Sequence, residues 1–183
     1  QLKINQTILI HGGAGGVGIP TIQIAKAMGA IVFTTARKVH HEFLLGLGAD
    51  YVIDYKNEDY IQKINQLTSN EGVNVVIDTI GNNTLSESGK ILSQLGQVVS
   101  IVDIEKPQNL IEAWGKNATY HFVFTRQSRN KLDELTKLVE SGKLKPVSTK
   151  TFSLSEIGMA HSLLETKAGD ADFYGKIAIE VEH

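Results

Sequence analysis

A cluster of glycines near the start of the chain constrains its fold more than any other feature. The apolar residues 7–10 lead into it, and Gly13, Gly15 and Gly18 match the spacing G-x-G-x-x-G. In a strand–turn–helix unit the first glycine allows the tight turn, the second lets a pyrophosphate approach the backbone, and the third lets helix and strand pack closely. We therefore expect a strand, a phosphate-binding loop and a helix that begins near Ile19, whose unpaired N–H groups favour an anion.

Six apolar segments rich in Val and Ile predict the strands of a parallel sheet. Near-continuous apolar runs are typical of strands that are buried on both faces. Segments with helical periodicity separate most of them, and this alternation indicates a doubly wound (Rossmann) α/β fold with right-handed crossovers. The predicted strands span residues 7–11, 30–35, 51–54, 73–78, 97–101 and 120–125.

The intervening segments contain the start and stop signals of helices. Asn57 is a candidate cap for a helix over residues 60–67, and the apolar spacing of residues 85–95 predicts a helix that ends before Gly96. A further apolar stripe over residues 132–139 predicts a helix that ends at Gly142.

From residue 147 onward the alternation changes, and we divide the chain there. Residues 147–152 and 176–181 predict two short extended segments. Between them Ser153 and Glu156 have the spacing of a capping box, which predicts the start of a helix. We expect a Rossmann domain over residues 1–146 and a strand–helix–strand tail over residues 147–183.

The end of the second predicted strand indicates which dinucleotide binds. NAD-binding units usually place a carboxylate there, to accept from the ribose 2′-hydroxyl. Here Thr35 is followed by Arg37 and Lys38, and no carboxylate occurs before Glu42. A hydroxyl and two cations suit a 2′-phosphate, so NADP is favoured over NAD. The alternative is that Arg37 and Lys38 merely begin a solvated surface segment.

Other polar residues are weaker candidates for a site. His11 is adjacent to the glycines, but a packed strand end is the more common role, and Asp78 is expected to be a structural carboxylate beside backbone N–H groups. His40 and His41 diverge by about 100° on a helix, so we expect no metal site. We assign no catalytic residue, because in hydride transfer a nicotinamide carries the chemistry. Trp114 is expected in the core or in an interface.

Composition excludes several classes of function. A net charge of −2 over 183 residues gives no reason to expect a nucleic-acid partner. No apolar run approaches the roughly 20 residues of a membrane span. The absence of cysteine excludes disulfides and fits a reducing compartment, so we expect a cytoplasmic protein.

Several stretches of the chain are similar to one known family. They read ILIHGGAGGVG, LGLGADYVIDY, GVNVVIDTIGNNTL, LGQVVSI, LTKLVESGKLKPV and YGKIAIEV, and they cover nearly the whole chain. The chain thus resembles the medium-chain dehydrogenase/reductase superfamily, in its zinc-independent, quinone oxidoreductase-like branch. The resemblance implies contacts to the pyrophosphate, to the 2′-phosphate, to the nicotinamide ribose and to the nicotinamide. The residues implied are, in that order, Gly15, Gly16 and Val17; Tyr55; Thr79, Ile80 and Gly81; and Ile101, Val102 and Phe124.

The resemblance also implies that this chain is one half of a longer enzyme. In that family a β-rich catalytic domain precedes the glycine motif, and the tail packs on it. We expect hydride transfer from NADPH to a quinone or an activated alkene (an enone) in the whole protein, and no turnover by residues 1–183 alone. The sixth predicted strand, which contains Tyr120 and Phe124, is an apolar sheet edge, so we expect a homodimer through it.

Two other functions remain open at this point. The chain could be a non-catalytic module that binds NADPH and a partner protein. A methyltransferase that uses S-adenosylmethionine also opens with a glycine-rich strand–helix turn. Such enzymes usually carry an acidic residue just before the glycines, where this chain has Ile10 and His11, so this function is the less favoured.

Overall fold

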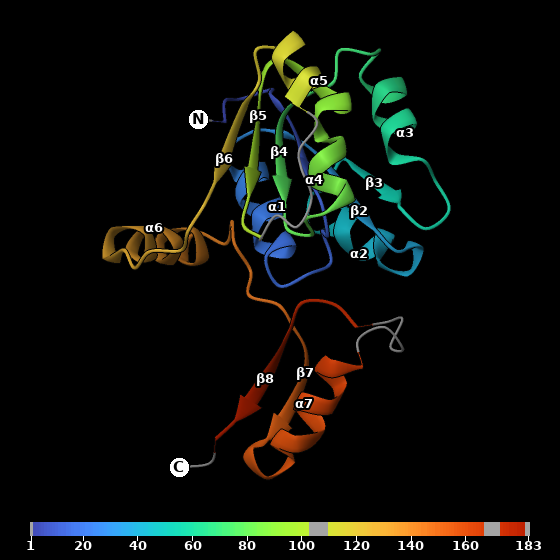
Figure 1. The fold of residues 1–183 in the computed structure, drawn as a ribbon. Helices are drawn as coiled ribbons and strands as arrows, with labels where there is room; N and C mark the ends of the chain where they lie inside the picture. Colours follow the sequence, from blue (N-terminus) through green and yellow to red (C-terminus); the bar gives the residue numbers. More distant parts are fainter. Residues whose placement is uncertain (1, 103–109, 167–172, 182–183) are drawn as a thin grey trace.

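The computed structural model describes residues 2–102, 110–166 and 173–181, and its main body is a six-stranded parallel sheet (Figure 1). The strands lie in the order β3-β2-β1-β4-β5-β6, so the order reverses between β1 and β4. Doubly wound sheets bind ligands in the crevice outside the carboxyl ends of the strands at such a reversal. The predicted fold class is confirmed. The strands are β1 (Thr7–Ile10), β2 (Ile31–Ala36), β3 (Tyr51–Asp54), β4 (Val73–Asp78), β5 (Leu92–Ser100) and β6 (Thr119–Phe122).

Helices cover both faces of the sheet. Successive strand residues point to opposite faces, and because these residues are apolar, each face must be shielded from water. Ile8 and Ile10 of β1 belong to the core cluster on one face, whereas Leu9 belongs to the cluster on the other. Full burial of a side chain such as Leu9 stabilises the fold by about 1.5–3 kcal/mol. Among the described residues, none of the helices has the length and apolar character of a membrane span. One face carries α1 (Gly18–Ala27), η1 (Lys38–His40) and α2 (His41–Gly46), and the other carries α3 (Tyr60–Leu67), α4 (Asn83–Glu87), η2 (Ser88–Ile91) and α5 (Leu110–Gly115).

The helix that we predicted up to residue 95 is wrong in its second half. α4 ends at Glu87, the 3-10 helix η2 follows, and β5 already begins at Leu92, which pairs with Val73 in the parallel ladder. Leu95 lies in an irregular part of β5, with a φ of +59° and 73% of its surface exposed. Strand pairing therefore overrides the apolar spacing that suggested one continuous helix face.

The cap of α3 is Asp59 rather than Asn57. The Asp59 carboxylate accepts from the backbone N–H groups of Ile61 and Gln62, at 2.9 and 3.1 Å. Asn57 instead donates its side-chain amide to Asp54 at 2.7 Å. Both residue types cap helices well, but only Asp59 directly precedes the first turn.

The tail forms a strand–helix–strand unit, as predicted. Its two strands pair in parallel, and Figure 1 shows the unit below the main sheet, joined to it by the segment of chain between α6 and β7. The capping box of Ser153 and Glu156 is present. The elements of the tail are β7 (Ser148–Ser153), η3 (Leu154–Glu156), α7 (Ile157–Glu165) and β8 (Lys176–Glu180).

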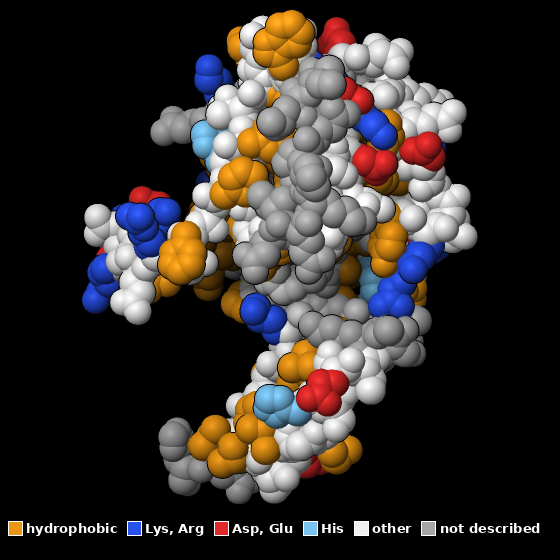
Figure 2. All heavy atoms as spheres, viewed as in Figure 1, with side chains coloured by type: hydrophobic (Ala, Val, Ile, Leu, Met, Phe, Trp, Pro, Cys, Tyr) orange, Lys and Arg blue, Asp and Glu red, His pale blue; other side chains and the backbone are white. Residues whose placement is uncertain are grey.

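Between the two parts, α6 (Arg129–Glu140) projects from the body of the molecule (Figure 1). It begins after the cap Ser128, which our sequence reasoning did not identify. It ends before Gly142, as predicted, and none of its described residues is buried. The space-filling view shows a hollow between α6, the sheet domain and the tail (Figure 2). Trp114 of α5 is 83% exposed, so it does not lie in the core, and its alternative place in an interface stays a prediction.

Candidate functional site

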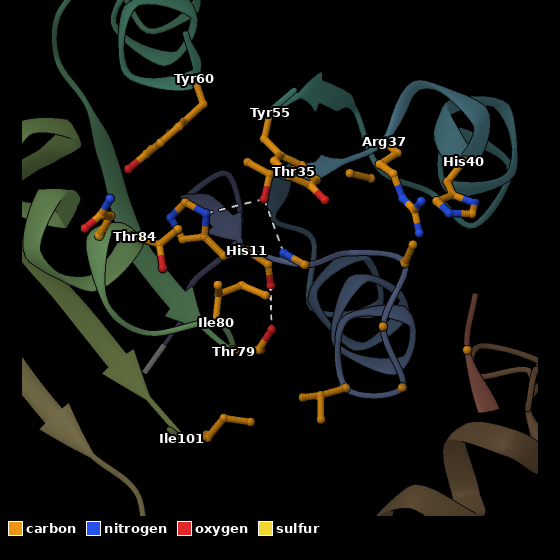
Figure 3. A pocket seen from close by; sticks show the side chains of 18 of the residues that line it. His11, Thr35, Arg37, His40, Tyr55, Tyr60, Thr79, Ile80, Thr84 and Ile101 are labelled. Atoms are coloured by element: carbon orange, nitrogen blue, oxygen red, sulfur yellow. Dashed lines mark hydrogen bonds between the residues drawn. The ribbon is translucent and has the colours of Figure 1, made fainter. Parts of the chain in front are cut away.

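A cavity of about 710 Å³ lies at the carboxyl ends of the strands, where the strand order reverses (Figure 3). Its walls come from the glycine loop between β1 and α1, from the ends of β2, β3, β4 and β5, from α3 and α4, and from the segment of the tail just before β8. Elements far apart in the sequence therefore meet at this point. The cavity has the size that is usual for small-molecule sites in proteins.

Two glycines of the loop lie too close to neighbouring atoms to carry a side chain. A Cβ atom at Gly13 would collide with Thr34 Oγ1, and one at Gly18 would collide with Gly12 O and lie 2.7 Å from Gly13 Cα. The residue with the left-handed backbone is Gly12, with a φ of +73°. The tight turn that we assigned to Gly13 is thus made one residue earlier, and Gly13 is needed for the contact with Thr34.

Gly15 differs from these glycines because its surroundings are open. Among the described residues, the nearest atom to a Cβ placed on it is Gly12 O, at 3.2 Å, which is a tight but tolerable contact. Gly15, Gly16 and Val17 line the cavity just before α1 begins. This part of the loop can receive an anion at the positive end of the helix dipole.

Thr35 fixes the loop rather than offering a free hydroxyl. Its Oγ1 accepts from the backbone N–H of Gly12 at 3.2 Å, and its carbonyl accepts from that of Gly13 at 3.0 Å. His11 Nδ1 lies 3.4 Å from the same Oγ1. Thr35 is 4% exposed, so it touches the cavity mainly through this network.

His11 is a packed residue, as we expected, and it also belongs to the cavity wall. It is 1% exposed and its ring lies edge-to-face against Tyr60, with centroids 5.1 Å apart. Burial lowers the pKa of His11 to about 4, against the opposing charges of Asp78 and Glu87. The imidazole is therefore neutral near pH 7, and its Nε2 has no hydrogen-bond partner among the described residues.

Asp78 is a structural carboxylate, as predicted. It accepts from the backbone N–H of Gly81 at 3.0 Å, from Thr84 Oγ1 at 2.8 Å and from Ser100 Oγ at 3.2 Å. These bonds hold the turn after β4, where Gly81 has a φ of +81°. Gly81 therefore stabilises this turn and does not itself line the cavity.

Most of the predicted site residues line the cavity, and some do not. Lys38 is exposed on η1, and Phe124 is 87% exposed beyond the end of β6. The predicted residues in the wall are Gly15, Gly16, Val17, Thr35, Arg37, Tyr55, Thr79, Ile80 and Ile101. The predicted residues outside the wall are Gly13, Lys38, Gly81, Val102 and Phe124.

The segment of the tail that leads into β8 supplies wall residues that our sequence reasoning missed. Gly175 donates its backbone N–H to Ala14 O at 2.8 Å and forms a β-bridge with Gly15. Phe173 lines the cavity, and the side chain of Lys176 lies against Gly16, with Nζ 3.3 Å from the place of a Cβ. The stretch YGK was part of the family resemblance, but nothing local in it indicates a contact with the glycine loop.

A polar group at one end of the cavity was also missed. Tyr60, Thr84 and Glu87 come from α3 and α4, and Tyr60 donates its hydroxyl to Glu87 Oε2 at 3.0 Å. Burial, followed by the charge of Glu87, raises the pKa of Tyr60, so it remains a phenol. In Figure 3 Tyr60, Thr84 and His11 lie together on the side of the cavity away from Arg37.

Comparison with known proteins finds relatives along nearly the whole chain. Residues 47–178 match the family described as zinc-binding dehydrogenase. The acryloyl-coenzyme A reductase of Metallosphaera sedula is 32% identical over 170 residues, which cover 91% of this chain and 49% of the reductase. The D-arabinose 1-dehydrogenase (NADP(+)) of Saccharolobus solfataricus is 34% identical over 172 residues, which cover 89% and 47%.

Solved structures with the same fold also exist. The quinone oxidoreductase from Coxiella burnetii superimposes with a TM-score of 0.83 at 35% identity, over 99% of this chain and 54% of that one. The chain therefore spans about half the length of each of these three proteins.

Proposed function

The chain belongs to the zinc-binding dehydrogenase family, in the quinone oxidoreductase-like part of the medium-chain dehydrogenase/reductase superfamily, and from this premise we propose that it binds NADP(H) as the cofactor-binding half of an oxidoreductase. The main support for this cofactor assignment is the open glycine loop together with Arg37 at the end of β2. The loop suits a pyrophosphate. The guanidinium suits a 2′-phosphate, at a position where NAD-binding sites usually carry a carboxylate.

The size of the cavity and the glycine loop that forms part of its wall both suit a dinucleotide. Its volume of about 710 Å³ lies within the usual range of small-ligand sites. The open backbone at Gly15 leaves room for a phosphate, and Gly15, Gly16 and Val17 lie at the positive end of the α1 dipole. Lys176, whose side chain lies against Gly16, adds a cation beside the same loop.

The described residues do not fit the zinc that the family's description mentions. Among residues 2–102, 110–166 and 173–181, no group of three or more His, Cys, Asp and Glu side chains could hold a metal ion. The chain also has no cysteine. The proposal therefore assigns no metal to these residues.

The reaction that we propose is hydride transfer to a quinone or an activated alkene in the whole protein. A bound nicotinamide supplies the hydride. Thr79, Ile80 and Ile101, at the carboxyl ends of β4 and β5, line the side of the cavity assigned to it and limit the access of water. The names of two relatives, an acryloyl-coenzyme A reductase and a quinone oxidoreductase, support this class of acceptor.

The remaining surface supports two proposals about assembly. Leu154, Ile157 and Met159 of the tail are exposed apolar side chains, and we propose that residues 147–183 pack on the other half of the oxidoreductase. β6 is the edge of the sheet, with Phe122 and Val123 about half exposed. An apolar edge of this kind favours pairing with a second copy of the chain.

Calorimetric titration of the chain with NADPH and NADH tests the cofactor assignment. We expect NADPH to bind at least tenfold more tightly, because a charge-assisted hydrogen bond contributes about 1.5–3 kcal/mol. Arg37→Gln should remove most of this preference, and Lys38→Gln should remove less, since Lys38 lies outside the wall. Arg129→Gln on α6 is the matched control.

The titration results distinguish an error in the assignment of the 2′-phosphate from an error in the proposed dinucleotide binding. Tighter binding of NADH, or an unchanged preference in Arg37→Gln, would contradict the assignment of the 2′-phosphate. Failure of both dinucleotides to bind would overturn the proposed function as a whole.

A further inference from the structure

Gln23 is a buried polar residue of α1 that lies outside the cavity wall. It is 5% exposed, and its side-chain amide pairs with the backbone of Lys145, 122 positions away. Gln23 Nε2 donates to Lys145 O at 3.1 Å, and Gln23 Oε1 accepts from the Lys145 N–H at 2.8 Å. Burial of an amide is costly unless its polar atoms are paired. The amide thus makes, for the segment between α6 and β7, the pair of hydrogen bonds that a neighbouring strand would make.

The same face of α1 also meets the segment that leads into β8. Ile19 lies one turn before Gln23, so the two side chains share a face of the helix. A Cβ atom on Gly175 would lie 3.3 Å from Ile19 Cδ1 and 3.3 Å from Val147 O. Val147 follows Lys145 by two positions and packs against the core cluster on this side of the sheet. The segment that Gln23 holds is therefore the one against which Gly175 packs.

Gly175 in turn fixes the part of the tail that borders the cavity. It lines the cavity itself, and its backbone N–H donates to Ala14 O of the glycine loop at 2.8 Å. The next residue, Lys176, has its side chain against Gly16 of the same loop. Contacts therefore run without a gap from Gln23 to the place where the loop and the tail meet.

We propose that Gln23 is a positioning residue for the dinucleotide site, a role that rests on the function proposed above. It holds the segment before β7 against α1, this segment supports Gly175, and Gly175 keeps Lys176 beside the glycine loop. Without the amide, the backbone N–H and C=O of Lys145 can pair only with water, which favours a position of this segment away from α1. The wall that packs against the segment then loosens. Gln23 therefore strengthens cofactor binding without contact to the cofactor.

Calorimetric titration with NADPH tests this role in Gln23→Met, which keeps the length of the side chain and removes both hydrogen bonds. We expect binding about fivefold weaker than in the parent chain, because the Lys176 amine loses its fixed place. The double variant with Lys176→Gln should bind less than about tenfold more weakly than the parent, whereas independent effects would multiply to about 25-fold. Ile91→Val is the matched control. It also lowers Tm, because it removes a methylene from a fully buried side chain on the other face of the sheet, but it should keep the parent affinity.

Hydrogen exchange distinguishes a positioning role from a general loss of stability. The Gly175 amide should exchange at least about tenfold faster in Gln23→Met, whereas the amides of β4 should keep their parent rates. Equal acceleration at Gly175 and in β4 would overturn the proposal. Gln23→Asn, whose amide is one methylene too short for both bonds to Lys145, should behave like Gln23→Met. It takes the place of that variant if thermal melting shows that Gln23→Met folds poorly.

A failure of this proposal can be told apart from a failure of the proposed function. Parent-like affinity in both Gln23 variants, with NADPH still bound by the parent chain, would overturn the positioning role alone. Multiplicative losses in the double variant would do the same, because Gln23 would then act independently of Lys176. If NADH binds more tightly than NADPH, the same series is measured with NADH. If no dinucleotide binds to the parent chain, both proposals fall.

Discussion

Gly15 and Gly18 lie three residues apart, and adding a side chain should affect different properties at the two positions. At Gly18 it should lower the stability of the fold, whereas at Gly15 it should weaken NADPH binding. In Gly18→Ala the new Cβ would lie 2.7 Å from Gly13 Cα and even closer to Gly12 O. Both contacts are with backbone, which cannot rotate away. Overpacking of this kind costs about 1–3 kcal/mol, and for a chain of this length it should lower Tm by roughly 2–12 °C.

In Gly15→Val the new side chain would instead enter the cavity. Its Cβ would also meet a backbone atom, Gly12 O, but at 3.2 Å, so a shift of a few tenths of an ångström relieves the contact and we expect Tm to change by less than about 2 °C. The methyl groups would keep a pyrophosphate away from the loop N–H groups. The loss of about two charge-assisted hydrogen bonds, roughly 3 kcal/mol in total, would weaken NADPH binding by about 100-fold.

Scanning calorimetry and titration with NADPH measure the two effects on the same proteins. Gly46→Val, at a glycine of α2 with nothing within 4 Å of a new Cβ among the described residues, is the control for the substitution itself. The reasoning is refuted if Gly15→Val binds NADPH like the parent chain, or if Gly18→Ala melts at the parent temperature.

Four further predictions concern other parts of the molecule. Lys176→Gln should weaken NADPH binding by about fivefold in titration, with Lys143→Gln as a matched control, because its amine lies beside the glycine loop. The pKa of His11 is about 4 in the folded chain and about 6.5 in the unfolded chain, so its contribution to stability is full above pH 6.5 and is lost as pH falls towards 4. Urea melts at pH 7 and pH 5 should therefore show a loss about 2 kcal/mol larger in the parent chain than in His11→Gln. Phe122→Glu should convert the expected homodimer into a monomer in light scattering, whereas a parent chain that is already monomeric would contradict the edge pairing. Finally, the 183-residue chain should bind NADPH without oxidising it in the presence of a quinone or enone, and steady turnover in an absorbance assay would contradict this.

The parts of the fold that the sequence predicted correctly are those with a local physical signal. Strand residues such as Leu9 and Ile10 are buried on opposite faces, and a run of apolar residues is what such a strand requires. The glycine spacing predicted the loop because the Thr34 side chain at Gly13 and backbone atoms at Gly18 leave no room for a Cβ. These signals depend on neighbours within a few positions of the chain.

The parts that the sequence did not predict depend on contacts between distant residues. Gly175 reaches Ala14 across about 160 positions, and no local pattern at either residue indicates the contact. Arg37 and Lys38 are adjacent and alike in charge, so the sequence could not decide between them, but only Arg37 lines the cavity. The helix predicted through Leu92 failed for a similar reason, because its partner Val73 lies about 20 positions away.

The β-bridge between Gly15 and Gly175 has a thermodynamic consequence for the tail. The glycine loop and the tail both line the cavity and are bridged to each other, so a ligand that filled the cavity would contact both. Binding and the docking of the tail are then linked equilibria, and each must strengthen the other by the same factor. Anything that holds the β7–β8 unit in place, such as a protein surface packed against it, raises the affinity of the cavity without touching the ligand. The β7–β8 unit, which contacts the glycine loop through Gly175, would thus act as an allosteric element that modulates the cavity.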